Sequence, residues 1–145
     1  DNIVRQCEIS SKDIVYELGC GRGRCCFWLN CLLKCKVVGI EYIPAFIEKA
    51  NHVKTELHFD NIEFRLGDIL DADYSGATVL YLYGTCYDAP FLKKLLKKLN
   101  MLPSGTKIIT VSYHLTDYSA DYEVMKRFPA EFTWGTGDVY LQIKR

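Results

Sequence analysis

A short run of glycines with one acid before it is the strongest chemical signal in this 145-residue sequence. Residues 17–23 read ELGCGRG, so Gly19, Gly21 and Gly23 alternate with other residues and Glu17 lies two positions before the first glycine. Glycines let the backbone turn sharply and lie close against a ligand, where a Cβ atom would collide. Exposed N–H groups at the start of a following helix favour an anionic group or a carboxylate. The run therefore predicts a ligand site, and its G-x-G-x-G spacing differs from the G-x-G-x-x-G of a pyrophosphate-binding turn.

Two further acids stand where we expect the second and third strands to end. A carboxylate at Glu41 can accept hydrogen bonds from both hydroxyls of a ribose, which would fit a nicotinamide dinucleotide equally well. Asp68 can accept a hydrogen bond from an adenine amino group, with Ile69 packed against one face of the ring and Tyr42 or Ile43 against the other. Taken alone, a Gly-Asp pair is common in turns. Three acids at the ends of successive strands, in this order, point to a ligand that contains adenosine.

The elements that must position these residues alternate between strands and helices. Short apolar or alternating runs predict five strands, at residues 14–18, 37–40, 62–66, 77–83 and 106–113. Apolar residues at helical spacing predict helices at 24–34 and 44–57, and a Lys/Leu helix after the fourth strand. This order describes an open, mostly parallel sheet covered by helices, which binds ligands at the carboxyl ends of its strands.

The end of the chain has a different pattern. Residues 130–134 and 139–143 alternate between apolar and polar side chains, and residues 135–138 (GTGD) read as the turn between them. We therefore predict a terminal β-hairpin. No repeat, low-complexity tract or linker interrupts the sequence, so residues 1–145 are predicted to form a single domain.

Over nearly its whole length the sequence resembles the class I, seven-stranded S-adenosyl-methionine-dependent methyltransferases. VYELGCGRGR resembles their first motif, GIEY the second and LGDIL the third, while ATVLYLY and the final hairpin are similar to their fourth strand and reversed seventh strand. The resemblance implies S-adenosyl-L-methionine as cofactor and a Rossmann-like three-layer α/β sandwich, whose mostly parallel seven-stranded sheet ends in an antiparallel hairpin. It also implies roles for the following residues: Glu17, Gly19, Gly21 and Gly23 border the methionine end, Glu41 holds the ribose, Asp68 and Ile69 the adenine, and Tyr83 lies near the reactive centre.

The resemblance also suggests a class of methyl acceptor. GxGxGR and residues 83–87 (YGTCY) are similar to the seven-stranded protein-lysine methyltransferases, so a protein lysine is the favoured acceptor and a small molecule the next. The asparagine-proline-proline-aromatic motif of base-amino methylation does not follow the fourth strand, which argues against a nucleic acid acceptor.

Methyl transfer from a sulfonium needs positioning rather than a nucleophilic triad, and no triad is visible. Aromatic and imidazole side chains at strand ends are candidates to line an acceptor channel: Tyr83, Tyr87, Tyr113 and His114. His114 is the one histidine placed to act as a base. Cys86 has no histidine paired with it locally, and we interpret it as a packed thiol.

Composition excludes several other classes. The formal net charge is zero, so no long-range field gathers nucleic acid. The one dense basic cluster alternates with leucines, as on a solvated helix face: Lys93, Lys94, Lys97 and Lys98. Seven cysteines without a CxxC pair predict reduced thiols in a cytoplasmic protein and no metal site. No apolar run approaches the ~20 residues that span a bilayer.

Two alternative functions remain: a non-catalytic subunit that retains the cofactor fold, and an NAD-dependent oxidoreductase. The glycine spacing, Asp68 and the terminal hairpin disfavour the oxidoreductase. Methyltransferases of this type often carry an N-terminal lid, whereas only about a dozen residues precede the first predicted strand. We therefore expect either a minimal core or a chain that lacks its acceptor-specificity elements.

Overall fold

A seven-stranded mixed sheet forms the centre of the computed structural model, which describes residues 1–84 and 87–145. Its strand order is β3-β2-β1-β4-β5-β7-β6. The bounds are β1 Ile14–Leu18, β2 Lys36–Glu41, β3 Ile62–Leu66, β4 Val79–Leu82, β5 Lys107–Val111, β6 Tyr122–Phe132 and β7 Gly135–Lys144. Strands β1 to β5 are parallel, whereas β7 lies antiparallel to both β5 and β6. The predicted Rossmann-like fold with its terminal antiparallel pair is confirmed.

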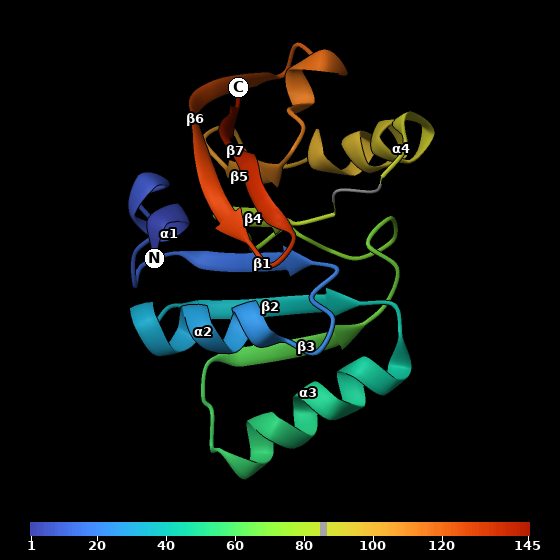
Figure 1. Cartoon of the computed structure of the whole chain (residues 1–145). Coiled ribbons are helices and arrows are strands. Elements are labelled where there is room, and N and C mark those ends of the chain that lie inside the picture. Colours follow the sequence, from blue (N-terminus) through green and yellow to red (C-terminus); the bar gives the residue numbers. More distant parts are fainter. Residues whose placement is uncertain (85–86) are drawn as a thin grey trace.

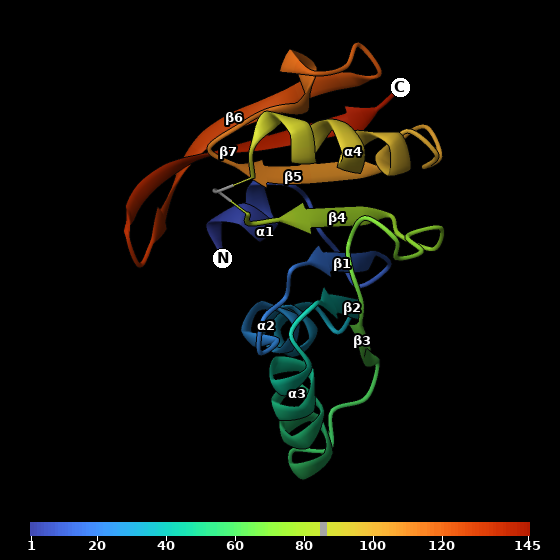
Figure 2. The same cartoon turned by 90° about the vertical axis from the view of Figure 1, so that its right-hand side faces the viewer.

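Helices cover both faces of the sheet (Figures 1 and 2). They are α1 Asn2–Gln6, α2 Arg24–Leu33, α3 Pro44–Glu56 and α4 Ala89–Leu99, with a 3-10 turn η1 at Leu115–Asp117. The first three pack against one face and α4 against the other. None of the helices in the described residues is long and apolar enough to cross a membrane.

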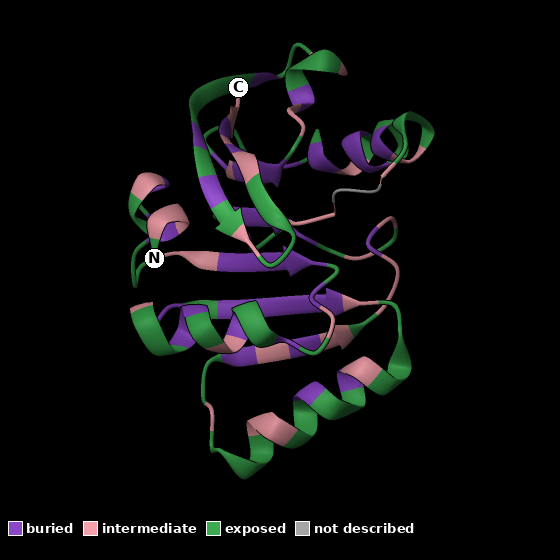
Figure 3. Cartoon of the chain, in the orientation of Figure 1, coloured by how far each residue is buried: buried purple, intermediate pink, exposed green. Residues whose placement is uncertain are grey.

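The core follows from the alternation of side chains along the strands. In β1, Val15 lies in the cluster beneath α1 to α3, while Tyr16 and Leu18 lie in the cluster beneath α4. Because both faces are covered, the central strands are almost continuously buried, and exposed residues gather on the outer helix surfaces (Figure 3).

Helix α4 likewise buries one face and exposes the other. Its four buried residues are the leucines Leu92, Leu95, Leu96 and Leu99, while Lys93, Lys94 and Lys97 are exposed. The Asp88 side chain caps the helix by accepting a hydrogen bond from the Phe91 N–H at 2.9 Å. The basic cluster is therefore a solvated helix face, as predicted.

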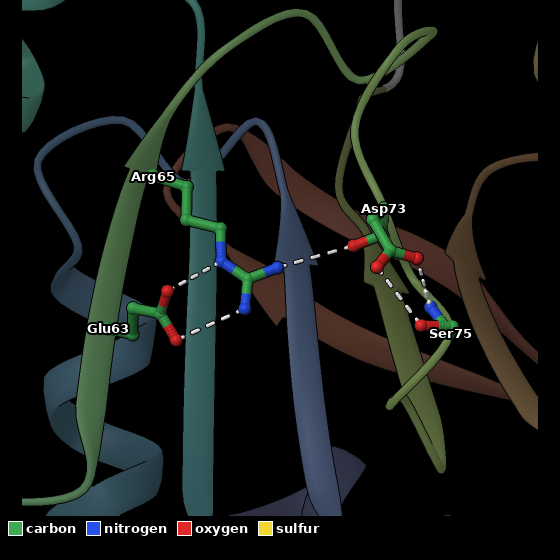
Figure 4. A network of polar contacts seen from close by, with 4 residues as sticks. All are labelled: Glu63, Arg65, Asp73 and Ser75. Carbon is green, nitrogen blue, oxygen red and sulfur yellow. Dashed lines mark hydrogen bonds and ion pairs between the residues drawn. The ribbon is translucent and has the colours of Figure 1, made fainter.

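The connection between β3 and β4, residues 67–78, forms no helix. An ion pair between Arg65 and Glu63 on β3 lies beside this connection. Arg65 donates to both carboxylate oxygens of Glu63, at 2.7 and 3.1 Å, and to the backbone carbonyl of Asp73 at 3.4 Å (Figure 4). Its guanidinium also lies 5.5 Å from the centre of the Tyr16 ring. The hydrogen bonds from Arg65 lower the pKa of Glu63. The bond from Arg65 to the Asp73 carbonyl ties the β3–β4 connection to β3.

The position of the hairpin turn was predicted wrongly. Residues 133–134 form the turn, Phe132 pairs with Gly135, and residues 135–138 belong to β7. Glycine at 137 is required by packing rather than by a turn, because a Cβ there would lie 2.5 Å from Cη2 of Trp134. The indole thus folds back over the strand, and Gly137 makes room for it.

Candidate active site

The glycine turn after β1 is fastened to the end of β2. Gly19, Gly21 and Gly23 have φ angles of +78°, +55° and +78°, in the left-handed region that favours glycine. The N–H of Gly19 donates to the Ile40 carbonyl at 2.8 Å, and the N–H of Gly21 donates to Oε2 of Glu41 at 2.8 Å. Backbone and side-chain bonds together fix the path of the turn.

Two carboxylates are oriented by backbone N–H groups at the ends of β2 and β3. Oε1 of Glu41 accepts from the N–H groups of Tyr42 and Ile43, both at 3.0 Å. Oδ1 of Asp68 accepts from the Leu70 N–H at 2.8 Å. Both carboxylates are therefore held at the carboxyl edge of the sheet.

An open cleft of about 430 Å³ joins these elements. It is lined by Gly19, Glu41, Tyr42, Asp68, Ile69, Tyr87 and Phe91. The cleft thus brings together five residues assigned to cofactor binding from the sequence. Its two carboxylates can accept hydrogen bonds from hydroxyl and amino groups, and its apolar and aromatic side chains can pack against a flat ring.

Glu17 precedes the glycine turn and Gly23 is its last glycine, and neither is among the residues that line the cleft. Glu17 is only 5% exposed, and the Cys26 thiol donates to its Oε2 at 3.0 Å. Burial raises the pKa of Glu17 to about 7. A Cβ on Gly23 would lie 2.5 Å from the Phe64 ring. Both residues support the turn from within the core under α2.

Tyr83 and Tyr87, both assigned to the acceptor channel from the sequence, occupy different places. The Tyr87 ring stacks on Phe91 at 4.5 Å and lines the cleft itself. Tyr83 instead faces the β6–β7 hairpin: its hydroxyl accepts a hydrogen bond of 2.5 Å from the Trp134 indole N–H, and its ring lies 5.5 Å from Phe132. Tyr83 therefore borders the side of the sheet away from Glu41 and Asp68.

The remaining channel candidates have local partners or buried positions. His114 Nδ1 lies 2.6 Å from the Thr116 hydroxyl, and Nε2 lies 3.5 Å from the Asp117 carboxylate. The Tyr113 hydroxyl is buried without a hydrogen-bond partner in the described part of the chain, and burial raises the pKa of Tyr113. Cys86, like Thr85, lies outside the described residues.

Sequence reasoning missed Phe91, Phe132 and Trp134. Tyr87 lies before the Asp88 N-cap of α4, so helical spacing does not account for its stacking on Phe91. Phe132 and Trp134 appeared only as alternating residues of a strand, and no local pattern predicted their contact with Tyr83.

The described residues contain neither a disulfide nor a cluster of metal ligands. The six cysteines they include are free thiols. Residues 1–84 and 87–145 contain no group of three or more histidine, cysteine or acidic side chains that could hold a metal ion.

The comparisons with known proteins agree on one kind of protein. A family model described as a methyltransferase domain matches residues 9–143. An RNA methyltransferase from Salinibacter ruber, solved with S-adenosyl-L-homocysteine, is 27% identical; the match covers 99% of this chain and 88% of that one, with a TM-score of 0.81. Magnesium protoporphyrin IX methyltransferase from Synechocystis, solved with bound SAM, is 12% identical over 100% of this chain and 77% of that one, with a TM-score of 0.79, and shows the shared fold. The comparison with curated proteins gave no match.

Proposed function

We propose, since this chain belongs to the methyltransferase domain family, that it transfers a methyl group from S-adenosyl-L-methionine to a protein lysine that reaches the carboxyl ends of β4 and β5. Membership of the family and the solved relatives make it an S-adenosyl-methionine-dependent methyltransferase. The proposed position of the reaction rests on one observation. In the cleft, Glu41 and Asp68 lie on the β2 and β3 side of Gly19.

The residues of the cleft fit this cofactor. Glu41 can accept a hydrogen bond from a ribose hydroxyl at the lone-pair site that its three backbone donors leave, and these donors fix the carboxylate at the end of β2. Asp68 can accept from the adenine amino group, with Ile69 and Tyr42 supplying apolar contacts to the ring. When bound, the cofactor supplies a methyl group on a sulfonium that is already a good leaving group.

The chain's own residues then have to position the acceptor and exclude water. With the adenosine held toward β2 and β3, the open approach to the reactive end lies at the ends of β4 and β5, beside Tyr83. The Tyr83 ring and the hairpin aromatic residues provide an apolar wall there. Transfer of a lysine side chain into these surroundings favours its neutral amine, which is the nucleophilic form. Alignment at near-attack distance supplies the rest of the acceleration.

The lysine acceptor is supported by the similarity of the glycine turn and of residues 83–87 to protein-lysine methyltransferases. RNA is the second candidate, because a relative 27% identical over nearly all of this chain is an RNA methyltransferase. Small molecules are acceptors of other proteins with this fold, such as the mitomycin 7-O-methyltransferase MmcR, which is 14% identical.

A labelling experiment separates these acceptors. The chain is incubated with S-adenosyl-methionine carrying a labelled methyl group, and with the protein, RNA and small-molecule fractions of a cell extract. Label in protein that appears as methyl-lysine after acid hydrolysis supports the proposal, whereas label only in RNA or in small molecules overturns the lysine assignment. Calorimetry with S-adenosyl-homocysteine and with NAD tests the cofactor: binding of NAD alone would overturn the methyltransferase assignment, and cofactor binding without transfer to any fraction would favour a non-catalytic subunit.

A further inference from the structure

We infer that the Tyr87 side chain occupies the crevice that the reactive end of the cofactor needs, and that it has to turn away from Gly84 before S-adenosyl-methionine can bind. Tyr87 then controls how fast and how tightly the cofactor binds. This inference rests on the proposed function, because it takes the cleft beside Glu41 and Asp68 as the site of the adenosine. It assigns to Tyr87 a role at the other end of the cofactor.

The crevice lies where the strand order reverses, between β1 and β4 (Figure 1). The chain passes from β1 outward to β2 and β3, then returns to the other side of β1 as β4 and continues to β5. In open parallel sheets, ligands bind outside the carboxyl ends of the strands at this point of reversal. The last paired residues of β1 and β4 are Leu18 and Leu82, so Gly19, Tyr83 and Gly84 border the crevice.

The Tyr87 side chain lies across this crevice. Its ring rests on the backbone of Gly84, where a Cβ atom would collide with the ring. Its hydroxyl oxygen lies 3.4 Å from the place that a Cβ atom on Gly19 would take. The ring is also stacked on Phe91, with 4.5 Å between the ring centres. Tyr87 therefore reaches from the end of β4 to the turn after β1.

The cleft on the β2 and β3 side ends at the Tyr87 ring. Its lining includes Gly19 and Tyr87 but not Tyr83, although Tyr83 directly follows β4. Adenosine held by Glu41 and Asp68 fits on the near side of the ring. A sulfonium that delivers its methyl group beside Tyr83 has to lie beyond Gly19, in the space that the Tyr87 ring fills. The ring and the reactive end of the cofactor therefore exclude each other.

This exclusion predicts the sign of a mutational effect. A side chain that fills part of a binding site lowers the apparent affinity, because only molecules in which it has turned away can bind. Removal of the Tyr87 ring should therefore strengthen cofactor binding. Removal of a side chain that contacts the bound cofactor should weaken it. The two possible roles of Tyr87 thus give opposite results.

Surface plasmon resonance with the full chain immobilised measures the effect, with S-adenosyl-homocysteine and adenosine as the two probes. Tyr87→Leu keeps an apolar side chain beside Phe91 but is too short to reach Gly19. We expect it to raise the association rate and the affinity for S-adenosyl-homocysteine about 5-fold or more, and to leave the affinity for adenosine within about twofold. Tyr87→Phe keeps the ring and should bind both probes like the unmodified chain.

Tyr118→Leu is the matched control, because Tyr118 is a half-buried tyrosine that packs against the same core cluster but does not line the cleft. It should leave both affinities within about twofold. Unchanged or weaker binding of S-adenosyl-homocysteine by Tyr87→Leu, or an equal gain for adenosine, would overturn the inference. A lack of S-adenosyl-homocysteine binding by the unmodified chain would instead contradict the proposed function.

Gly84→Ala tests the position of the ring independently. Its added Cβ atom would collide with the Tyr87 ring, so the two residues should be coupled. We expect Gly84→Ala to change the association rate of S-adenosyl-homocysteine about threefold or more when Tyr87 is present, and less than about twofold in the Tyr87→Leu chain. Equal changes in the two chains would contradict a ring that rests on Gly84 and blocks the crevice.

Discussion

The N–H of Gly21 donates a hydrogen bond of 2.8 Å to Oε2 of Glu41, so the glycine turn after β1 is tied to the acid at the end of β2. The other oxygen of Glu41 accepts from the N–H groups of Tyr42 and Ile43. A carboxylate has about four lone-pair sites, and three of them here receive backbone donors. The acid that would hold the ribose therefore also holds the backbone of the two loops beside it.

Glu41→Ala is expected to weaken binding of S-adenosyl-homocysteine by about 1–3 kcal/mol, because hydroxyl donors of the ribose lose a charged acceptor. Because three N–H groups are bonded to Glu41, we expect the free energy of unfolding to fall by about 1–2 kcal/mol as well. Calorimetry and urea unfolding measure the two effects. Glu48→Ala, on the exposed side of α3, serves as control, and an unchanged affinity in Glu41→Ala would show that the acid holds only the loops.

Burial of Glu17 makes stability depend on pH. Its pKa is raised from 4.5 to about 7 in the folded chain, chiefly by desolvation. Between these values the folded state keeps a proton that the unfolded state releases, so stability falls as pH rises. The stabilisation is fully present below about pH 4.5 and is lost by about pH 7; over that interval the loss is about 3 kcal/mol.

Glu17→Gln tests this dependence, because glutamine has a similar shape and does not titrate in this range. The slope of unfolding free energy against pH between 5 and 7 should become markedly flatter than in the unmodified chain. Glu48→Gln should leave the slope as it was. If Glu17→Gln retains the full slope, another group is responsible for it.

Much of this site follows from strand ends alone. Glu41 and Asp68 line one cleft because residues that end parallel strands meet at one edge of the sheet. The hairpin turn was misplaced because Gly135 and Gly137 are typical turn residues, and the packing of Trp134 over the strand leaves no local signal. The contact between Trp134 and Tyr83 joins residues 51 positions apart and depends on how far the hairpin extends. Such contacts are set by tertiary packing, which local pattern does not encode.

Gly21 and Gly23 offer a matched pair of substitutions. Both have positive φ, so alanine costs about 1–2 kcal/mol of backbone strain at either position. At Gly21 a Cβ meets nothing within 4 Å, whereas at Gly23 it lies 2.5 Å from the Phe64 ring. Gly23→Ala should therefore lower the free energy of unfolding by about 1–3 kcal/mol more than Gly21→Ala does. Equal losses in urea unfolding would mean that Phe64 moves aside without cost.

Tyr83 is the residue on which the placement of the acceptor depends. It lies at the end of β4, bonded to Trp134, and is not among the residues that line the cleft. Tyr83→Ala should lower the methyl-transfer rate at saturating cofactor by about tenfold or more, because it removes the wall against which the acceptor is aligned. Affinity for S-adenosyl-homocysteine should stay within a few-fold. Tyr83→Phe, which keeps the ring but not the hydroxyl that receives the Trp134 N–H, should have an intermediate rate. If Tyr83→Ala instead loses cofactor binding and transfers normally once saturated, then Tyr83 belongs to the cofactor site and the acceptor enters elsewhere.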